Sequence, residues 1–349
     1  MSTEQADPTI ARVEGVERDL RGLQDDVAMT DIQDALGEID AQVRDLPGAI
    51  QALRSRGYVF KKYLENKAQV LTGQWADMRG RVMAAVDEQS RLLREQADQA
   101  QQRVTPLRWN RDEGEVAAVE SVIADLESRL RAATRAIQNM YEPLRENISQ
   151  TAGQIKEVAW TLDQVDAASF KLYPGEGVVA AVKVQWMTSE KEGPKGIFYV
   201  TEDRLLFEQR EEVATKKVLF ITTEKQKLQE LKWQAAVGQV EQVTASEQGG
   251  AILGIGKKEL LGLGFDNRVP IRQALLRLEA DSDAWQALIG RVKSGDIAGE
   301  RTCPRDEAIK EAVRAAPTKC PTCGAGITQA IVRGMNEIKC EYCGAVIRL

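Results

Sequence analysis

The chain has no histidine among its 349 residues, and this absence removes several classes of enzyme. A Ser-His-Asp triad, a Cys-His pair and an H-E-x-x-H metalloprotease all require an imidazole as a base or as a metal ligand. The same absence excludes a C2H2 zinc finger and a Glu-x-x-His di-iron bundle. Only carboxylate, lysine, cysteine or metal chemistry remains. We find no catalytic set of such groups, so we expect a protein that is not an enzyme.

Aromatic residues make up only 5% of the chain, and no apolar run approaches the roughly 18–20 residues of a membrane-spanning helix. The first residues, MSTEQADPTIARVE, lack the basic and apolar segments of a secretory signal. Five cysteines, four of them in two C-x2-C pairs, suit a reducing compartment and a metal better than disulfides. With 47 basic and 53 acidic residues, the net charge of −6 argues against nonspecific electrostatic binding to nucleic acid. We therefore expect a cytoplasmic protein, with attachment to a membrane surface left open.

Residues 29–168 carry apolar side chains at alternating spacings of three and four residues. One series runs from Ile32 to Val82, with Gly57 in one of its slots, and a second runs from Val116 to Val165. A period of 3.5 residues held over many turns is typical of long helices that wind around one another. This segment therefore predicts a helical coiled coil.

Pro106 and Gly114 interrupt the pattern between the two series, and Asp112 can cap the helix that follows. We predict an antiparallel helical hairpin with its turn near residues 104–114 and arms of about 80–100 Å. Such a rod provides reach, spacing or self-association, so a homo-oligomer through the coiled coil is one expectation. We also expect a short amphipathic helix in residues 1–28, and a kink or a restart of the first arm at Pro47-Gly48.

Between residues 170 and 295 the apolar period changes from 3.5 towards two residues, which indicates strands. The final helical segment has Trp285, Leu288, Ile289 and Val292 on one face, and Asp281 or Asp283 is available as its N-cap. The segments that we expect to be strands are 178–186, 196–200, 204–207, 217–221, 237–243 and 260–265.

This order of segments resembles the GRAM and bacterial pleckstrin-homology-like (PH-like) domains. The resemblance rests on Gly196-x-x-x-Val-Thr-x-x-Arg-Leu-Leu-Phe207, on the strand at 237–243 and on the closing helix with Trp285. It implies a bent, partly open barrel of about seven strands capped at one end by a helix, a lipid- or protein-binding role, and no catalytic residues. One departure is the segment 220–233, FITTEKQKLQELKW, which is helix-prone where the family has a shorter connection.

Two further patterns in this region could indicate a phosphate-binding loop and an anion site, but they fit an ordinary connecting loop and an exposed charged face better. The glycine-rich stretch 249–258 is not a Walker A loop, because Ala251 replaces the first glycine and Lys258 replaces the Ser or Thr. We expect a connecting loop there, with insertion into a membrane surface as the alternative. Five lysines interleave with glutamates, which predicts a mixed solvated face and not an anion site: Lys216, Lys217, Lys225, Lys227 and Lys232.

The carboxyl-terminal segment, 318–349, contains a repeated motif. Lys319-Cys-Pro-Thr-Cys-Gly-Ala325 recurs as Lys339-Cys-Glu-Tyr-Cys-Gly-Ala345, with the spacing C-x2-C-x16-C-x2-C. Each half resembles a zinc knuckle and the whole resembles a zinc ribbon, with strands at 327–332 and 346–349. We predict that one structural zinc ion is bound by Cys320, Cys323, Cys340 and Cys343.

Several details of this motif suit the predicted zinc ion. Gly324 and Gly344 can adopt positive φ, which turns backbone N–H groups towards the sulfurs, and Lys319 and Lys339 offset the charge of four thiolates. So short a segment buries little apolar surface, so we expect metal binding to supply much of its folding energy. A rubredoxin-type iron site is the alternative. A catalytic zinc fits poorly, because four thiolates leave no open ligand position.

The segment 296–317 is expected to be a linker with a short charged helix at 304–315. Cys303 lies in this linker without a partner at ligand spacing, so we interpret it as a free thiol. Its reactivity is left open.

These segments predict a multidomain α + β protein: a long antiparallel coiled coil, a small PH/GRAM-like β-barrel with a capping helix, and a zinc ribbon. The expected function is a non-enzymatic scaffold or adaptor that binds protein partners through these three modules. One alternative is a peripheral membrane protein that binds anionic lipid through the PH-like domain. Another alternative is a ribbon that binds nucleic acid. The ribbon has too few net positive charges for strong, salt-dependent binding to phosphates. Its four basic residues are Lys319, Arg333, Lys339 and Arg348, and its two acidic residues are Glu337 and Glu341.

Overall fold

The computed structural model describes residues 8–189, 192–218, 221–249, 257–306, 319–327 and 337–348, without the side chains of 213–218, 221–226, 337 and 348. The chain divides into two compact units. The first comprises Met1–Ala49 and Glu65–Gly153, and the second comprises Ile50–Leu64 and Gln154–Leu349. None of the helices in the described part of the chain has the length and apolar character needed to cross a membrane.

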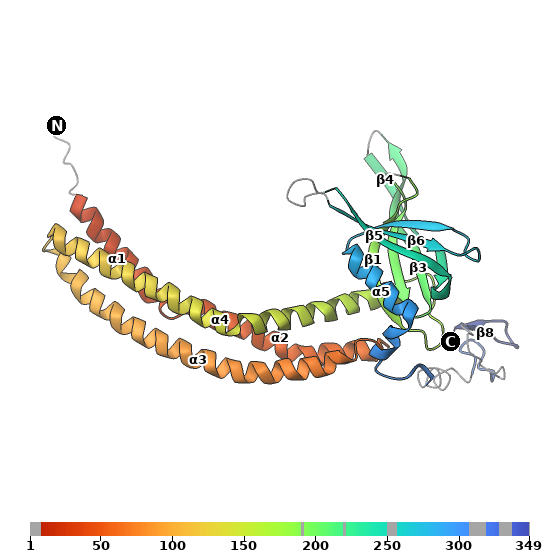
Figure 1. Cartoon of the computed structure of the whole chain (residues 1–349), viewed down its shortest axis with the longest axis horizontal. Coiled ribbons are helices and arrows are strands. Elements are labelled where there is room, and N and C mark those ends of the chain that lie inside the picture. The colour runs from red at the N-terminus through yellow and green to blue at the C-terminus, as the bar shows by residue number, and fades with distance from the viewer. Residues whose placement is uncertain are drawn as a thin grey trace. The chain divides into compact units, whose positions relative to one another are not determined.

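The described part of the first unit is helical: it contains the first of four long helices and most of the second, third and fourth (Figure 1). Trp75 donates from Nε1 to Asp40 at 2.7 Å, and Gln33 lines one pocket with Val86, so the second and third helices run antiparallel. Arg12 pairs with Glu120, and Gln42 lies beside Ser149, so the first two helices run parallel to the fourth. The four helices are α1 (Pro8–Asp26), α2 (Thr30–Ser55), α3 (Tyr63–Val104) and α4 (Glu113–Asp166).

The prediction of a single hairpin is wrong, because the chain also reverses between α2 and α3. Gly57 has a φ of +86° and Lys61 has a φ of +53°, and left-handed residues of this kind end a helix. Arg54 donates to the carbonyl oxygens of Tyr58 and Phe60 at 2.9 and 2.7 Å, which holds the reversed segment in place. The apolar pattern continues through the reversal because Tyr58 and Phe60 are themselves buried. Periodicity alone therefore did not reveal the turn.

The other helix junctions follow local chemistry. α2 is continuous through Pro47, so the restart expected there does not occur. Near 104–114 a short 3-10 helix, Thr105–Arg108, precedes α4, and Asp112 accepts the N–H of Glu115 at 2.9 Å as the expected cap.

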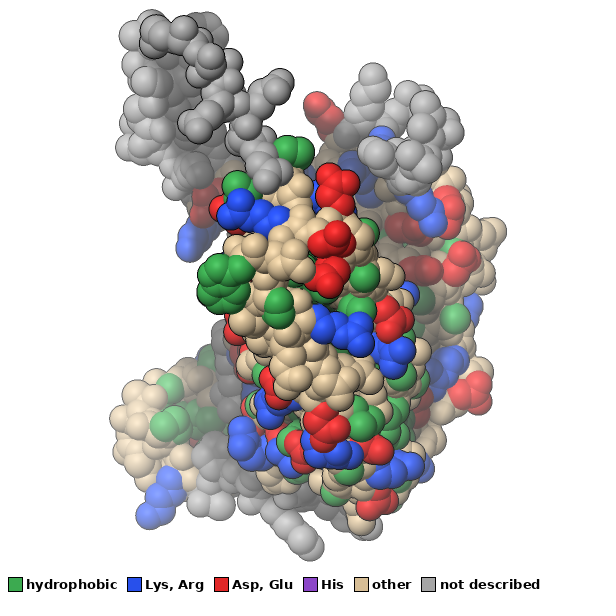
Figure 2. Space-filling model, turned by 90° about the vertical axis from the view of Figure 1, so that its left-hand side faces the viewer, with side chains coloured by type: hydrophobic (Ala, Val, Ile, Leu, Met, Phe, Trp, Pro, Cys, Tyr) green, Lys and Arg blue, Asp and Glu red, His purple; other side chains and the backbone are tan. Residues whose placement is uncertain are grey.

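Acidic and basic side chains are interleaved over the face shown in Figure 2, without a broad patch of one sign.

The second unit contains a seven-stranded antiparallel sheet with the order β4-β3-β2-β1-β7-β6-β5. β1 pairs with both β2 and β7, so strands from the two ends of the segment meet in the middle of the sheet. Seven strands followed by a helix is the arrangement that the PH-like resemblance implies. The elements are β1 (Val178–Trp186), β2 (Lys195–Thr201), β3 (Arg204–Val218), β4 (Ile221–Ala236), β5 (Val240–Gln248), β6 (Lys258–Phe265), β7 (Gln273–Leu278) and α5 (Ser282–Ser294).

β4 corrects two expectations. The helix-prone segment 220–233 lies mainly in this strand, which pairs with β3 along nearly its whole length. The separate strand expected at 217–221 is instead the point where β3 ends and β4 begins, with 219 and 220 outside the described residues. Pairing with a neighbouring strand thus overrides the local helix propensity of the Lys- and Glu-rich sequence. Residues 250–256 of the glycine-rich stretch also lie outside the described part of the chain.

The core of the sheet is aromatic. Trp233 lies 6.0 Å from Phe198, 6.1 Å from Phe207 and 5.4 Å from Phe265 between ring centroids. α5 adds Trp285, whose ring centroid is 5.7 Å from that of Phe198. As expected, Asp281 caps this helix by accepting the N–H of Ala284 at 2.9 Å. Leu288, which was expected on the same face as Trp285, is only half-buried and lines a separate groove.

Candidate metal centre

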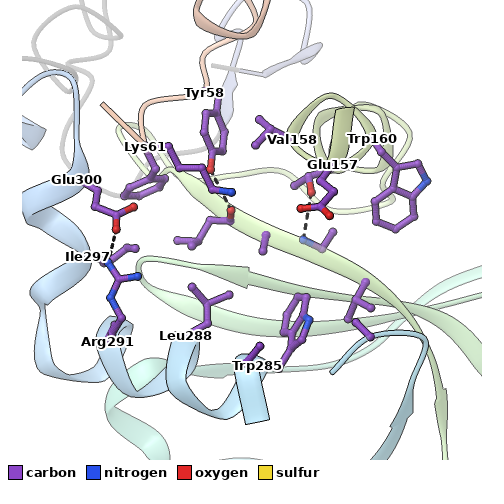
Figure 3. A pocket seen from close by; sticks show the side chains of 18 of the residues that line it. Tyr58, Lys61, Glu157, Val158, Trp160, Trp285, Leu288, Arg291, Ile297 and Glu300 are labelled. Carbon is purple, nitrogen blue, oxygen red and sulfur yellow. Dashed lines mark hydrogen bonds and ion pairs between the residues drawn. The ribbon is translucent and has the colours of Figure 1, made fainter. Parts of the chain in front are cut away.

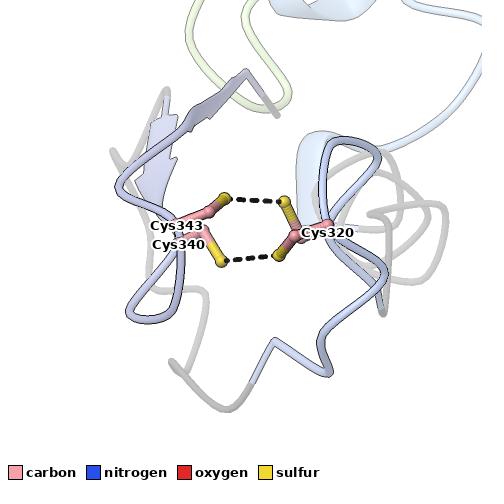
Figure 4. A group of neighbouring side chains, drawn as sticks. Cys320, Cys340 and Cys343 are labelled. Carbon is pink, nitrogen blue, oxygen red and sulfur yellow. Dashed lines mark hydrogen bonds between the residues drawn. The ribbon is translucent and has the colours of Figure 1, made fainter.

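The four predicted ligands, Cys320, Cys323, Cys340 and Cys343, lie together, with all their Sγ atoms within 4.8 Å of one another. Two pairs of sulfurs link the knuckles: Cys320 to Cys343, and Cys323 to Cys340, both at 3.7 Å (Figure 4). A tetrahedral ion with metal–sulfur bonds of about 2.3 Å requires sulfur–sulfur edges of about 3.8 Å. The cluster therefore has the size of a tetrahedral four-thiolate site.

The two knuckles have the same backbone hydrogen bonds. In the first, Gly324 donates to the carbonyl of Cys320 and Cys320 donates to that of Ala325, both at 2.8 Å. In the second, the equivalent bonds from Gly344 and from Cys340 are 2.9 and 2.8 Å long. Both glycines have positive φ, +75° and +70°, as the sequence predicts. The repeat in sequence is thus a repeat in structure.

Backbone N–H groups favour the thiolate at the first cysteine of each knuckle. The N–H groups of Cys323 and Thr322 lower the pKa of Cys320 to about 6, against the opposing effect of burial. Those of Cys343 and Tyr342 likewise lower the pKa of Cys340. This preorganised thiolate character is what a soft or borderline divalent metal requires.

Cys323 behaves differently from the first cysteine of its knuckle. The N–H of Ala325 favours its thiolate, but hydrogen bonds with the other thiols outweigh this and raise its pKa to about 12. Four sulfurs at these distances cannot all be anionic without a cation among them. The donor set therefore fits one divalent ion.

A small apolar cluster lies behind the sulfurs. Cys320 and Cys340 are buried and pack with Ile347, whereas Cys323 and Cys343 are exposed. Two short strands pair antiparallel beside this cluster, β8 (Glu337–Lys339) and β9 (Val346–Arg348). β9 falls in the predicted strand 346–349, but β8 was not predicted. Of the predicted strand 327–332, Ile327 is not in a strand and the other residues lie outside the described part of the chain.

Sequence reasoning missed two ion pairs, one buried and one half-buried, that hold the segment after α5. Arg301 pairs with Glu202 at 2.5 Å, and both side chains are less than one-tenth exposed. Arg305 donates to Asp203 at 2.8 Å. The only signal in the sequence was an acidic pair at the turn between β2 and β3, about one hundred residues from its partners.

Cys303 lies in this held segment, is half-buried, and is not part of the four-cysteine cluster. The helix expected at 304–315 falls largely on residues 307–318, outside the described part of the chain. Among the described residues, the structure adds no ligand to the four predicted from the sequence.

No family model matches the sequence, and neither does any curated protein. Similar solved structures include the DH/PH domains of p115-RhoGEF, at 12% identity and a TM-score of 0.22, covering 78% of this chain and 94% of that chain. Human RhoA in complex with the DH/PH fragment of PDZ-RhoGEF gives 10% identity and a TM-score of 0.24, covering 84% and 96%. The ternary complex of human RhoA, its inhibitor and the DH/PH domain of human ARHGEF11 gives 10% identity and a TM-score of 0.26, and the match covers 84% of this chain and 100% of that chain. At these TM-scores the likeness says nothing about what this chain binds.

Proposed function

We propose that this chain is a non-enzymatic adaptor that binds protein partners and that carries a structural zinc ion in its carboxyl-terminal ribbon. The observation that carries the proposal is the closed set of four cysteines, Cys320, Cys323, Cys340 and Cys343. A catalytic zinc normally has three protein ligands and an open position for water or substrate. Four thiolates around one ion leave no such position, so the metal holds the fold together and does not bind a substrate.

Exposed side chains of the ribbon support a role in protein contact. Tyr342 is 74% exposed and Val346 is 55% exposed. Tyr342 lies at the tip of the second knuckle, between its two cysteines, where the metal would make the backbone rigid. Tyrosine is among the residues that most often dominate protein interfaces, because it buries a large area at a low cost in side-chain entropy. We place the principal contact of the ribbon at Tyr342.

Metal content tests the first part of the proposal. The full chain, purified without added metal, should contain one zinc per molecule, and Cys320→Ser should lose it. Visible absorption from an iron–thiolate centre would instead support the rubredoxin-type alternative. A chain that folds its ribbon without any metal would contradict the structural role.

Partner capture from the native cell tests the second part. Tyr342→Ala should weaken binding of the captured protein by about 2 kcal/mol, or roughly 30-fold. Thr322→Ala is the matched control, because Thr322 has the same position in the first knuckle and an alanine keeps the same backbone N–H. Equal losses for the two variants, or turnover of a substrate by the purified chain, would refute the adaptor role at this surface.

A further inference from the structure

The second unit contains a groove of about 840 Å³ that the metal site and the adaptor role do not use. Residues 58–63, the carboxyl-terminal part of α4, strand β1 and helix α5 form its walls. Figure 3 shows Leu288 and Arg291 of α5 on one side, and Tyr58, Val158 and Trp160 on the other. The volume lies within the range of about 300–1,000 Å³ that is typical of small-molecule sites.

Small apolar side chains create this space. α5 packs Trp285, Ile289 and Val292 against the sheet, and turns Ala284 and Ala287 towards the groove. On β1 the facing residue is Ala181, where a larger side chain would fill the gap. A floor of methyl groups favours an apolar ligand, because such a ligand gains from leaving water.

Two hydroxyl groups of the walls are already engaged in hydrogen bonds to the backbone. The hydroxyl of Tyr58 donates to the carbonyl of Val179 at 3.3 Å, and Thr161 accepts the N–H of Ala181 at 3.3 Å. A ligand with many polar atoms would therefore lose its hydrogen bonds to water without replacing them. This argues against a nucleotide or a sugar and for a ligand with a long apolar body.

The charged lining residues determine the expected head group. Lys156 and Lys183 line the groove and are exposed, and neither has a carboxylate within 4.0 Å among the described residues. Arg291, by contrast, is paired with Glu300. The lining as a whole has four basic and three acidic residues, so its net charge favours an anion. The other charged lining residues are Lys61, Glu157 and Glu279.

The length of the groove limits the length of the ligand. β1 contributes the residues from Val179 to Lys183, a distance of about 13 Å at 3.3 Å per residue. An extended alkyl chain, with carbon–carbon bonds of about 1.5 Å, covers this distance with roughly ten carbons.

We propose that this groove binds a monomeric single-chain amphiphile, with an alkyl chain of roughly ten carbons on the apolar floor and a carboxylate at Lys156 and Lys183. The site is independent of the proposed zinc ion and of the adaptor role. It lies on α5, β1 and the end of α4, and none of the cysteines lines it.

The test uses the full chain and the compact anionic fluorophore 8-anilinonaphthalene-1-sulfonate, whose emission rises in apolar surroundings. Decanoate should displace the probe better than decanol, and decanol better than decyltrimethylammonium. Ala287→Trp should abolish probe binding by filling the groove. Gly290→Trp, on an exposed part of α5 with open space around its Cα, is the matched control and should bind normally.

Charge reversal tests the head group. Lys183→Glu should weaken decanoate binding about two- to fivefold, as expected for an exposed ion pair, whereas Lys195→Glu, outside the lining, should not. Thermal unfolding of each variant shows whether it remains folded. Unchanged binding in Ala287→Trp, equal displacement by the cationic competitor, or binding to phosphatidylglycerol vesicles with none to monomeric decanoate would overturn the proposal.

Discussion

Removal of the proposed zinc ion should unfold residues 319–327 and 337–348 and leave the seven-stranded sheet intact. The apolar support of the ribbon is small. Apart from the cysteines, the buried side chains among its described residues are Ile338 and Ile347. At roughly 1.5–3 kcal/mol for each fully buried isoleucine, they contribute about 3–6 kcal/mol. A structural zinc ion typically contributes about 10–16 kcal/mol, so the proposed ion would stabilise the ribbon more than this packing does, by a factor of about two or more.

Hydrogen–deuterium exchange, followed by mass spectrometry of the full chain, measures this directly. Before chelation, the N–H groups of Gly324 and Gly344 should be protected, because each donates to a carbonyl of its own knuckle. After chelation these two sites should exchange freely, whereas those of β2 and β3 should keep their protection. Re-addition of zinc should restore the first pattern.

The control for this experiment is Cys303→Ser, which removes a thiol outside the cluster and should respond to chelation as the natural chain does. Protection of the two knuckles that survives complete removal of metal would refute the reasoning. It would mean that apolar packing alone is sufficient to fold the ribbon.

Three further predictions concern the stability of the two units. Gly57→Ala should cost about 1–2 kcal/mol, because φ is +86° there, whereas Gly48→Ala, inside α2 with open space around it, should stabilise by about 0.5–1 kcal/mol. Urea unfolding checks both, and equal effects would contradict the left-handed turn. Glu202→Gln should cost about 3–5 kcal/mol by leaving Arg301 charged and buried, and a second change, Arg301→Met, should recover most of that loss in thermal unfolding. Although burial opposes it, hydrogen bonds from Gln229 and from the Ser169 N–H hold the pKa of Glu208 below its ordinary value of 4.5. Its stabilisation should therefore be complete above about pH 4.5 and be lost as the pH falls further. Glu208→Gln should flatten this acid dependence, and an unchanged pH profile would refute the assignment.

The candidate metal site could be predicted from the sequence because its determinants are local. Two cysteines separated by two residues can bind one ion only if the chain turns tightly, and Gly324 and Gly344 permit that turn at φ of +75° and +70°. The same holds for the caps at Asp112 and Asp281, where a side chain accepts an N–H three residues later.

Other elements depend on contacts that the sequence does not display. Residues 221–233 favour a helix locally but form part of β4, because β3 offers a full ladder of hydrogen bonds. Arg204 and Glu176 are both buried and form an ion pair across 28 residues, and neither is distinguished from surface charges by its neighbours in sequence.

The sequence by itself determined the long helices, the ligands of the candidate metal site and the change from helix to strand near residue 170, because each depends on spacings of two to four residues. Tertiary structure alone decided that α2 and α3 fold back on each other, that Arg301 reaches Glu202, and that Ala181 and Ala287 face a common groove. The physical reason is range. Local periodicity records which face of an element is apolar, but only packing between distant segments decides what that face meets and where space is left between them.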